Sequence, residues 1–456
     1  MSAEKSTAAR VTFGQVLKNR QFLLLWLAQL ISNFGDWLAI LALLSLIAYR
    51  YHGTAAQVSG IMIAFVIPVA FLGPVAGVFV DRWDTKKTMI SSDLIRAVIL
   101  GLMILATALT HLYILIFALS AVSAFFIPAQ TVAIRKLVRK EELLVANALN
   151  SQTVQFNRVI SPAIAGWLVS MFGEKACFWI DLGSFIASAI LVSVIAMAPG
   201  EKVKSEKGAA AVRTELTEGL RFIRSHGAIM FLVVSMMAAI FAVGAFDSLI
   251  VVYLRDVLSA SSRLLGEIIA LTGVGIIVGS LIIGRFGQKQ KKVYLISFGI
   301  LALGLSVLCT ALSGTAAIAL VGALALGVSA AYVLIPGQTL MQEETPHEIL
   351  GRVSSTSMSL VTVCQLMSFL VAGAIASVIG IRNLYYIVAA ILVAIGTAGY
   401  VYARSNRLAD QHTRGGPELA SADHAFPTGP EIERISDIHD VGAAMEPPAI
   451  QPAGSD

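Results

Sequence analysis

The chain of 456 residues consists mainly of long apolar runs separated by short polar segments. A helix needs ~20 apolar residues, at ~1.5 Å per residue, to cross the hydrocarbon core of a bilayer. Each run is about this long or longer, so the pattern predicts an all-α membrane protein with twelve transmembrane helices. The runs cover approximately residues 22–48, 55–80, 88–109, 112–137, 147–172, 177–198, 227–254, 264–286, 293–313, 315–341, 352–380 and 383–404.

Composition and charge agree with this topology. Hydrophobic residues make up 57% of the chain and charged residues only 13%, which a soluble core does not explain. The basic residues are not pooled in one patch, so we expect no nucleic-acid partner. Of the 33 lysines and arginines, 24 fall in alternate segments that include both termini and 5 in the intervening loops. Because cytoplasmic loops retain basic residues, we expect a multi-pass protein of the plasma (inner) membrane with both termini cytoplasmic.

A polar linker divides the apolar runs into six and six. It is rich in Lys, Glu and Ala, and Leu216, Leu220 and Ile223 have helical spacing, so part of it is expected to rest on the cytoplasmic leaflet. The final segment is polar without periodicity, and we expect it to be disordered. The predicted parts are a cytoplasmic segment 1–21, a six-helix bundle 22–198, a linker 199–226, a second six-helix bundle 227–404 and a tail 405–456.

An internal repeat supports this division. The sequence IPAQT at residues 127–131 recurs as IPGQT at residues 335–339, near the end of the fourth run in each half. Four identities in five at equivalent places indicate a duplicated six-helix unit, as in transporters built from repeats. The two bundles are therefore expected to be pseudo-symmetric.

The charged turn after the second run carries the most specific motif. It has the pattern G-x-x-x-D-R-x-x-x-K and resembles the signature loop between helices 2 and 3 of the major facilitator superfamily. An ordinary basic cytoplasmic loop is the alternative. The resemblance implies a charge network that latches the cytoplasmic side. Its members here would be Gly77, Asp81, Arg82, Lys86, Asp93 and Arg96.

The first run carries a polar stripe, Gln29, Asn33 and Asp36, whose spacing stacks the side chains on one helix face. Asp36 lies ~21 Å and Arg158 ~18 Å from the cytoplasmic starts of their helices, at ~1.5 Å per residue. We therefore expect the two charges to meet or to share a water-filled site, with Asp36 as the proton-coupling acid and Arg158 as its partner. A permanent structural ion pair is the alternative.

The fifth run contains the sequence NRVISPAIAG, which resembles the antiporter motif of helix 5 in the same superfamily. The match is partial, because Ser-Pro stands where the family pattern has Gly-Pro. The resemblance implies a close, bent contact between the two halves. A packing helix kinked by proline explains the motif equally well. The motif residues here are Asn157, Ser161, Pro162 and Gly166.

In the superfamily fold that this chain resembles, the first and fourth helices of each six-helix half line the central cavity. That resemblance would place the two repeat glutamines near substrate, although amide bonding between helices is an alternative. The substrate-cavity residues expected here are Gln29, Asn33, Phe125, Phe126, Gln130, Tyr332 and Gln338.

Other residues give weaker signals. Asp247 is expected near the external end of its helix, where it is more simply an acid at the membrane interface than a charge that gates the cavity. Asp181 is interpreted as structural. The three cysteines show no disulfide frame or metal spacing. No catalytic or nucleotide-binding motif occurs in a suitable context. We therefore expect no enzyme activity, no cofactor and no metal.

The motif at Ser32–Trp37, SNFGDW, together with DRWDTKK and IPAQT, is most similar to the macrolide-efflux and enterobactin-exporter branch of the drug:proton antiporters. The resemblance covers about residues 12–405. It implies proton-driven export of an amphipathic small molecule by alternating access, with protons, substrate and membrane lipids as partners and a monomer as the working unit. The alternatives are a lysophospholipid or lipid flippase, and a membrane sensor or scaffold that does not transport.

Overall fold

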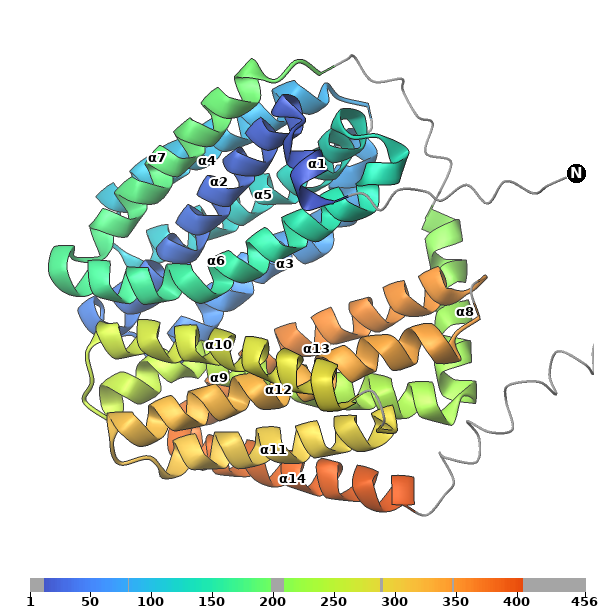
Figure 1. The fold of residues 1–456 in the computed structure, drawn as a ribbon. Helices are drawn as coiled ribbons and strands as arrows, with labels where there is room; N and C mark the ends of the chain where they lie inside the picture. The colour runs from blue at the N-terminus through green and yellow to red at the C-terminus, as the bar shows by residue number, and fades with distance from the viewer. Residues whose placement is uncertain (1–11, 81, 198–208, 288–289, 347, 405–456) are drawn as a thin grey trace, which may run out of the picture. The chain divides into compact units, whose positions relative to one another are not determined.

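The computed structural model describes residues 12–80, 82–197, 209–287, 290–346 and 348–404. Within these ranges all regular structure is helical (Figure 1). The chain divides into the units Met1–Val401 and Tyr402–Asp456, and everything below concerns the first, apart from the last residues of α14. The predicted tail, 405–456, lies outside the described residues.

Six long helices form the first half of the fold. A short helix, α1, precedes them, and a π-helical turn, η1, extends the first of them. The bounds are α1 Phe13–Leu17, α2 Arg20–Ser45, η1 Leu46–Arg50, α3 Ala55–Val80, α4 Thr85–Leu105, α5 Leu109–Leu137, η2 Lys140–Glu142, α6 Leu143–Phe172 and α7 Glu174–Val194.

Six further long helices form the second half, after a helix in the linker. The bounds are α8 Ala209–Ser225, α9 Gly227–Asp256, α10 Ser262–Phe286, α11 Lys292–Leu312, α12 Ala316–Glu344, α13 Leu350–Ile379 and α14 Ile381–Arg404. Each long helix agrees with a predicted apolar run to within a few residues at either end. Helix is the expected structure, because a chain in lipid must satisfy its backbone polar groups within the segment.

Eleven of the twelve long helices are long and apolar enough to cross a membrane. The exception is α6, although its 30 residues exceed the necessary length. Its mean hydropathy is lowered by polar residues in its first half, among them Asn147, Asn150, Gln152, Gln155 and Asn157. The protein is a multi-pass membrane protein. The fifth of the twelve predicted spans is α6, a more polar helix packed between α2 and α10.

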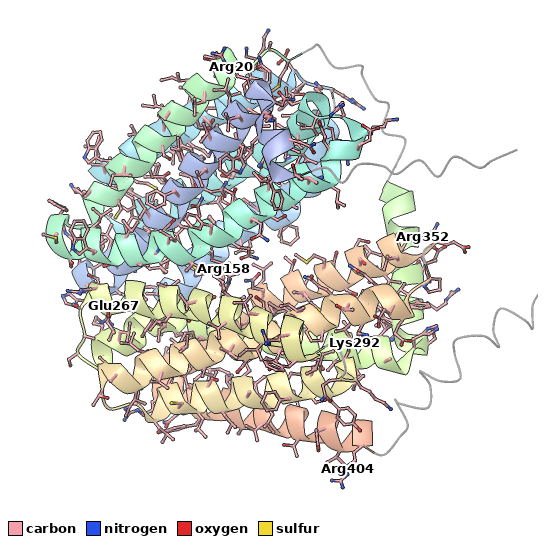
Figure 2. The ribbon with its side chains drawn as sticks, viewed as in Figure 1. Arg20, Arg158, Glu267, Lys292, Arg352 and Arg404 are labelled. Carbon is pink, nitrogen blue, oxygen red and sulfur yellow. The ribbon has the colours of Figure 1, made fainter. Side chains whose placement is uncertain are left out.

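Large apolar side chains on the outer surfaces of the helices are consistent with a lipid environment. Examples are Leu105, Phe71 and Val378, which are 74%, 67% and 84% exposed. A soluble protein rarely leaves so many large apolar side chains in water. Charged side chains gather at helix ends, where Arg20, Lys292 and Arg352 lie, whereas Arg158 is midway along α6 (Figure 2).

Within each half the helices pack in a set order. In the first half α2 packs on α6 and α7, α3 on α5, and α4 on α5 and α7. In the second half α10 and α11 both pack on α12, and α9 packs on α13 and α12. Close approach of α11 and α14 is permitted by Gly396, where an added Cβ would lie 2.8 Å from the Cα of Leu301.

The two halves meet through α6 with α10 and through α3 with α13. A Cβ on Gly266 would lie 2.9 Å from the Cα of Gly166, and a Cβ on Gly373 would lie 2.7 Å from the Cβ of Ser59. Both contacts lie near the loops Tyr51–Thr54 and Val257–Ser261. We call this end of the helices the distal end. The opposite end, which carries the linker, is the linker end. The glycines at these crossings let the halves close tightly at the distal end.

Helix α8 belongs to the linker and packs on α13. Glu218 forms an ion pair with Arg352 of α13, and a Cβ on Gly219 would lie 2.8 Å from the carbonyl oxygen of Arg352. The helix predicted from the spacing of Leu216, Leu220 and Ile223 is therefore present, and it is attached to the second half.

Candidate functional site

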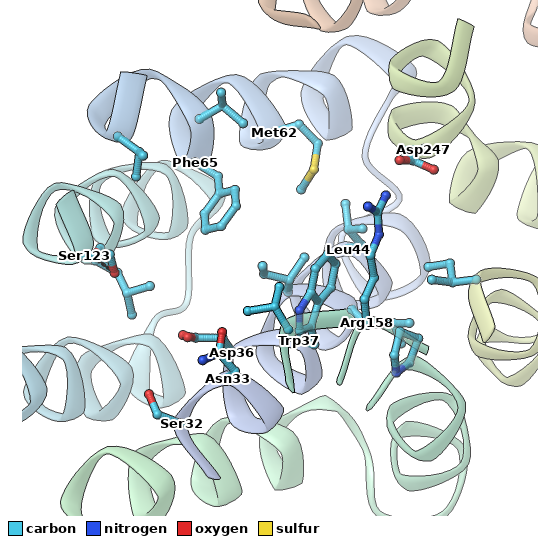
Figure 3. Close-up of a pocket in the computed structure, with 18 of the residues that line it drawn as sticks. Ser32, Asn33, Asp36, Trp37, Leu44, Met62, Phe65, Ser123, Arg158 and Asp247 are labelled. Carbon is cyan, nitrogen blue, oxygen red and sulfur yellow. Dashed lines mark hydrogen bonds between the residues drawn. The ribbon is translucent and has the colours of Figure 1, made fainter. Parts of the chain in front are cut away.

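A cavity of about 560 Å³ lies among α2 to α6 of the first half and α9, α10 and α13 of the second (Figure 3). Most of its lining is apolar, for example Met62 and Phe65 of α3 and Ile269 of α10. Four ionisable residues from different helices stand out in this lining, namely Asp36, Arg96, Arg158 and Asp247. Residues far apart in the sequence thus converge on one space within the membrane-spanning bundle.

Helix α2 directs its polar stripe into this cavity. Gln29, Asn33 and Asp36 all line it, as the helical spacing predicts. The Asn33 side-chain amide donates to the Gln29 carbonyl oxygen at 2.9 Å, and the Gln29 amide nitrogen is buried without a hydrogen-bond partner. Polar groups are costly in hydrocarbon, and facing a cavity gives them access to water or to a ligand.

Arg158 of α6 shares the cavity with Asp36, but no ion pair joins the two in the part of the chain that the structure describes. The Arg158 guanidinium lies 5.9 Å from the centre of the Trp37 ring, within the range of a cation–π interaction. It points toward Asp247 of α9 (Figure 3) and acts electrostatically on that carboxylate. Of the two expected arrangements, a direct contact or a shared site, the structure has the shared site. Asp36 is left without a cation in contact.

Asp93 and Arg96 form a buried ion pair on α4, with side chains 0% and 3% exposed. Ser188 of α7 donates to the second oxygen of Asp93 at 2.7 Å. The Arg96 guanidinium is sandwiched between two rings, 4.3 Å from the centre of Phe126 and 4.1 Å from that of Phe185. The pair therefore has a fixed geometry inside the first half.

The remaining residues of the predicted latch lie at the linker end. Arg82 is exposed, Lys86 is half-buried, and a Cβ on Gly77 would meet nothing within 4 Å. Asp81 lies outside the described residues. At the same end, Lys136 of α5 donates to the Thr85 hydroxyl of α4 at 2.8 Å and so joins these two helices. The structure thus separates the motif into an exposed turn and the buried pair on α4.

The motif of the fifth run lies on α6, where it faces both halves. Asn157 donates to the Leu30 carbonyl oxygen of α2 at 3.0 Å. Pro162 lies inside the helix and lines the cavity, and Ser161 beside it is fully buried, its hydroxyl without a partner. Gly166 is the point of contact with α10. The motif therefore forms a crossing between the halves, as the resemblance implied, and its role in transport stays a prediction.

The expected substrate residues divide into two groups. Gln29, Asn33, Phe126 and Gln130 line the cavity, and Gln130 also donates to the Asn150 side chain at 2.8 Å. The other three lie outside that lining in this structure. Phe125 stacks on Trp83 at 5.8 Å, Tyr332 packs against Phe298 at 5.4 Å, and Gln338 is exposed.

Several cavity residues were not identified from the sequence. They come from both halves, for example Met62 of α3, Thr272 of α10 and Gln365 of α13. Gln365 could have been found, because it is a lone amide inside an apolar run. The apolar members have no comparable signal, since lipid-facing and cavity-facing apolar residues look alike in sequence.

Two bundles of six long helices around an intramembrane cavity define the class of a major facilitator transporter. The family model of transmembrane secretion effectors matches residues 13–419, and the chain belongs to that family. No metal-binding group of three or more His, Cys, Asp or Glu side chains occurs among the described residues.

Relatives and solved structures agree with this assignment. The chain is 29% identical over 390 residues to the MFS-type transporter YfiS of Bacillus subtilis, covering 84% of this chain and 93% of that protein. It is 30% identical over 321 residues to macrolide efflux protein A of Enterococcus faecalis, covering 68% of this chain and 98% of that one. A bacterial homologue of the lysosomal transporter Spinster, solved inward-facing and unoccupied, shares the fold with a TM-score of 0.64 at 15% identity, covering 86% and 98% of the chains.

Proposed function

We propose that the protein is a proton-coupled exporter of an amphipathic small molecule, working by alternating access in the plasma membrane. The observation that carries the proposal is the apolar cavity between the halves, into which Asp36 projects without an ion-pair partner. An acid inside the membrane is costly unless it serves transport or is neutralised. Efflux proteins among the relatives support export as the direction.

The chemistry of the lining supports the substrate class. Ligand pockets of roughly 300–1,000 Å³ with mostly apolar walls bind apolar bodies, and a few polar groups orient them. Here Gln29, Asn33 and Gln130 would supply hydrogen bonds, while Met62 and Phe65 would contact the apolar part. A sugar or a phosphate would require more hydrogen-bonding or basic groups. One chain supplies both walls of the cavity, which supports a monomer as the working unit.

Asp36 would couple transport to the proton. In its ionised form the carboxylate attracts a cationic group and keeps water in the cavity, and in its protonated form it is compatible with an apolar, closed cavity. A proton bound from one side and released to the other would thus shift the balance between the two open states by its differential affinity for them. The close glycine contacts at the distal end support a state that opens at the linker end. We take the linker end as cytoplasmic because of the distribution of basic residues.

Transport by the purified full-length protein in proteoliposomes tests the proposal, with erythromycin as the probe and an imposed pH gradient. The parent should move the probe against its gradient only when the pH gradient is present. Asp36→Asn should abolish this response, because an amide cannot carry the proton. The matched control is Glu267→Gln on α10, an exposed acid paired with Arg263 outside the cavity lining, which should retain it.

Gradient-driven transport at the parental rate by Asp36→Asn would exclude Asp36 as the coupling acid. Movement of a fluorescent lysophospholipid that ignores the pH gradient, without transport of erythromycin, would instead support the flippase alternative. Absence of any transport by a folded parent would support a sensor or scaffold.

A further inference from the structure

Asp181 of α7 is an acid in the interior of the first half that the transport proposal does not use. Its side chain is 0% exposed. The Ser184 hydroxyl donates to Oδ1 at 2.9 Å, and Oδ2 has no hydrogen-bond partner. It lies against the backbone of α2, since a Cβ on Gly35 would be 3.0 Å from the Asp181 Cα. Helices α2 and α7 thus bring Asp181 next to Asp36.

The charges around these two acids are unbalanced. The cation that acts electrostatically on both acids is Arg96 of α4, which forms an ion pair with Asp93. The other ionisable groups are the Cys177 thiol, one turn before Asp181 on α7, and Arg158, which faces the large cavity and Asp247. No ion pair involves Asp36 or Asp181 in the described part of the chain. One guanidinium therefore serves three buried carboxyl groups.

A small cavity of about 10 Å³ joins the two acids. Asp36 and Asp181 line it together with apolar residues of α2 to α5. A space of ~10–15 Å³ holds about one water molecule if polar partners are present, and the two acids are the polar residues of this lining. Asp36 also lines the large cavity, and it is the one ionisable residue that the two linings share. Asp36 thus stands between Asp181 and the large cavity.

Two carboxylates in a low-dielectric site do not both ionise readily, because each negative charge opposes the other. A carboxyl group that keeps its proton has an O–H to donate. The unpartnered Oδ2 of Asp181 and the shared water-sized space fit a proton held between the two side chains, directly or through one water.

Building on the proposed function, we propose that Asp36 and Asp181 form one proton-binding site, in which Asp36 exchanges protons with the large cavity and Asp181 stores the proton behind it. When the proton moves inward, an O–H bond of Asp36 breaks as one forms on Oδ2 of Asp181, and an intervening water gives up one proton while taking another. The negative charge moves the opposite way. Asp181 thus keeps the proton away from the substrate space.

Infrared pH-difference spectroscopy of the full-length protein in lipid nanodiscs tests this with the proton alone as the ligand. The spectrum of the double variant Asp36→Asn with Asp181→Asn contains the other carboxyl groups and is subtracted. The remaining C=O band of protonated carboxyl groups should titrate in two separated steps in the parent, because interacting sites share macroscopic pKa values. Asp181→Asn and Asp36→Asn should each leave a single step. That step should lie lower than the upper parental step by about one pH unit or more, since the charge opposing the second ionisation is gone.

The proposal is overturned if Asp36 and Asp181 titrate independently, so that each single variant keeps its remaining step at the parental pH. It is also overturned if no protonated carboxyl band can be assigned to Asp181. If Asp181→Asn does not give folded protein, Asp36→Asn supplies the same comparison. Glu267→Gln serves as the control and should reproduce the two parental steps. The spectra can be recorded without transport. If Asp36 and Asp181 do not titrate as a coupled pair but gradient-driven efflux is intact, only this inference is wrong. If the two acids titrate as a coupled pair but the protein shows no efflux, the proposed function is wrong.

Discussion

The two halves of the molecule have the same six-helix order but place charge very differently. Within the first half, ionisable residues lie along the middle of α2, α4, α6 and α7. In the described part of the second half, Asp247 is the one acid or base placed midway along a long helix. The residues of the first group are Asp36, Asp93, Arg96, Arg158 and Asp181.

The second half instead relies on close backbone contacts. Helices α10 and α12 cross where a Cβ on Gly275 would lie 3.0 Å from the Cα of Gly327. A duplicated scaffold has thus been used in two ways. We infer that one half provides the ionic chemistry and the other a tightly packed wall for it to work against.

The largest effect is expected from the buried pair of the first half. Asp93→Asn leaves Arg96 inside the bundle without its carboxylate, which should cost about 3–5 kcal/mol of stability. Thermal unfolding of the purified protein in detergent measures this. The double variant Asp93→Asn with Arg96→Gln removes both charges and should recover part of the loss. If the single variant is as stable as its parent, the pair does not distinguish the first half energetically.

A smaller loss is expected from the glycine crossing of the second half. A Cβ on Gly327 would lie 2.9 Å from the backbone nitrogen of Ile276, and backbone cannot move aside as a flexible side chain can. Gly327→Ala should therefore cost about 1–3 kcal/mol by overpacking. The control is Gly73→Ala on α3, where a Cβ meets nothing within 4 Å and stability should stay the same or rise. Equal melting of both variants would contradict a tightly packed second half.

The smallest effect concerns the contact between the halves at the distal end. Arg255 of α9 donates to the carbonyl oxygens of Ala48 and Gly53 in the first half, the latter at 3.0 Å. Arg255→Gln should weaken closure by about 0.5–1.5 kcal/mol, because the shorter neutral amide replaces only part of the hydrogen bonding of the guanidinium. Spin labels at Thr54 and Ser377, on opposite halves, should then report a larger population of long distances.

The matched control for this experiment is Arg382→Gln. Arg382 lies at the same end and donates to the Ser313 carbonyl oxygen at 3.1 Å, but both residues belong to the second half. Its distance distribution should match the parent. A shift of the same size in both variants would mean that Arg255 does not act through the contact between halves.

Much of the fold could be predicted from the sequence, because each helix must satisfy its own backbone in lipid and its length is set by the bilayer. The apolar runs gave the twelve long helices, and the spacing of Leu216, Leu220 and Ile223 gave the helix in the linker. The polar stripe on α2 was assigned to a cavity on the same grounds, since Gln29, Asn33 and Asp36 could not face acyl chains at low cost.

The site could be predicted only in part. Similar depth in the membrane suggested that Asp36 and Arg158 belong together, but depth leaves the direction of a side chain open. In the structure Arg158 faces Asp247 on the other half. Tyr332 and Gln338 lie outside the cavity lining for a related reason: a proline in α12 permits a bend, but its sequence position does not say which face turns inward.

The sequence by itself determined that this chain crosses the membrane many times as a duplicated bundle, because burial of apolar runs and satisfaction of the backbone are local requirements. Only the tertiary structure decided which buried charges face one another. From the sequence Asp181 was interpreted as structural, and its position beside Asp36 depends on Gly35 allowing α7 to approach α2. Pairing between helices is set by such crossings, which a linear pattern does not specify.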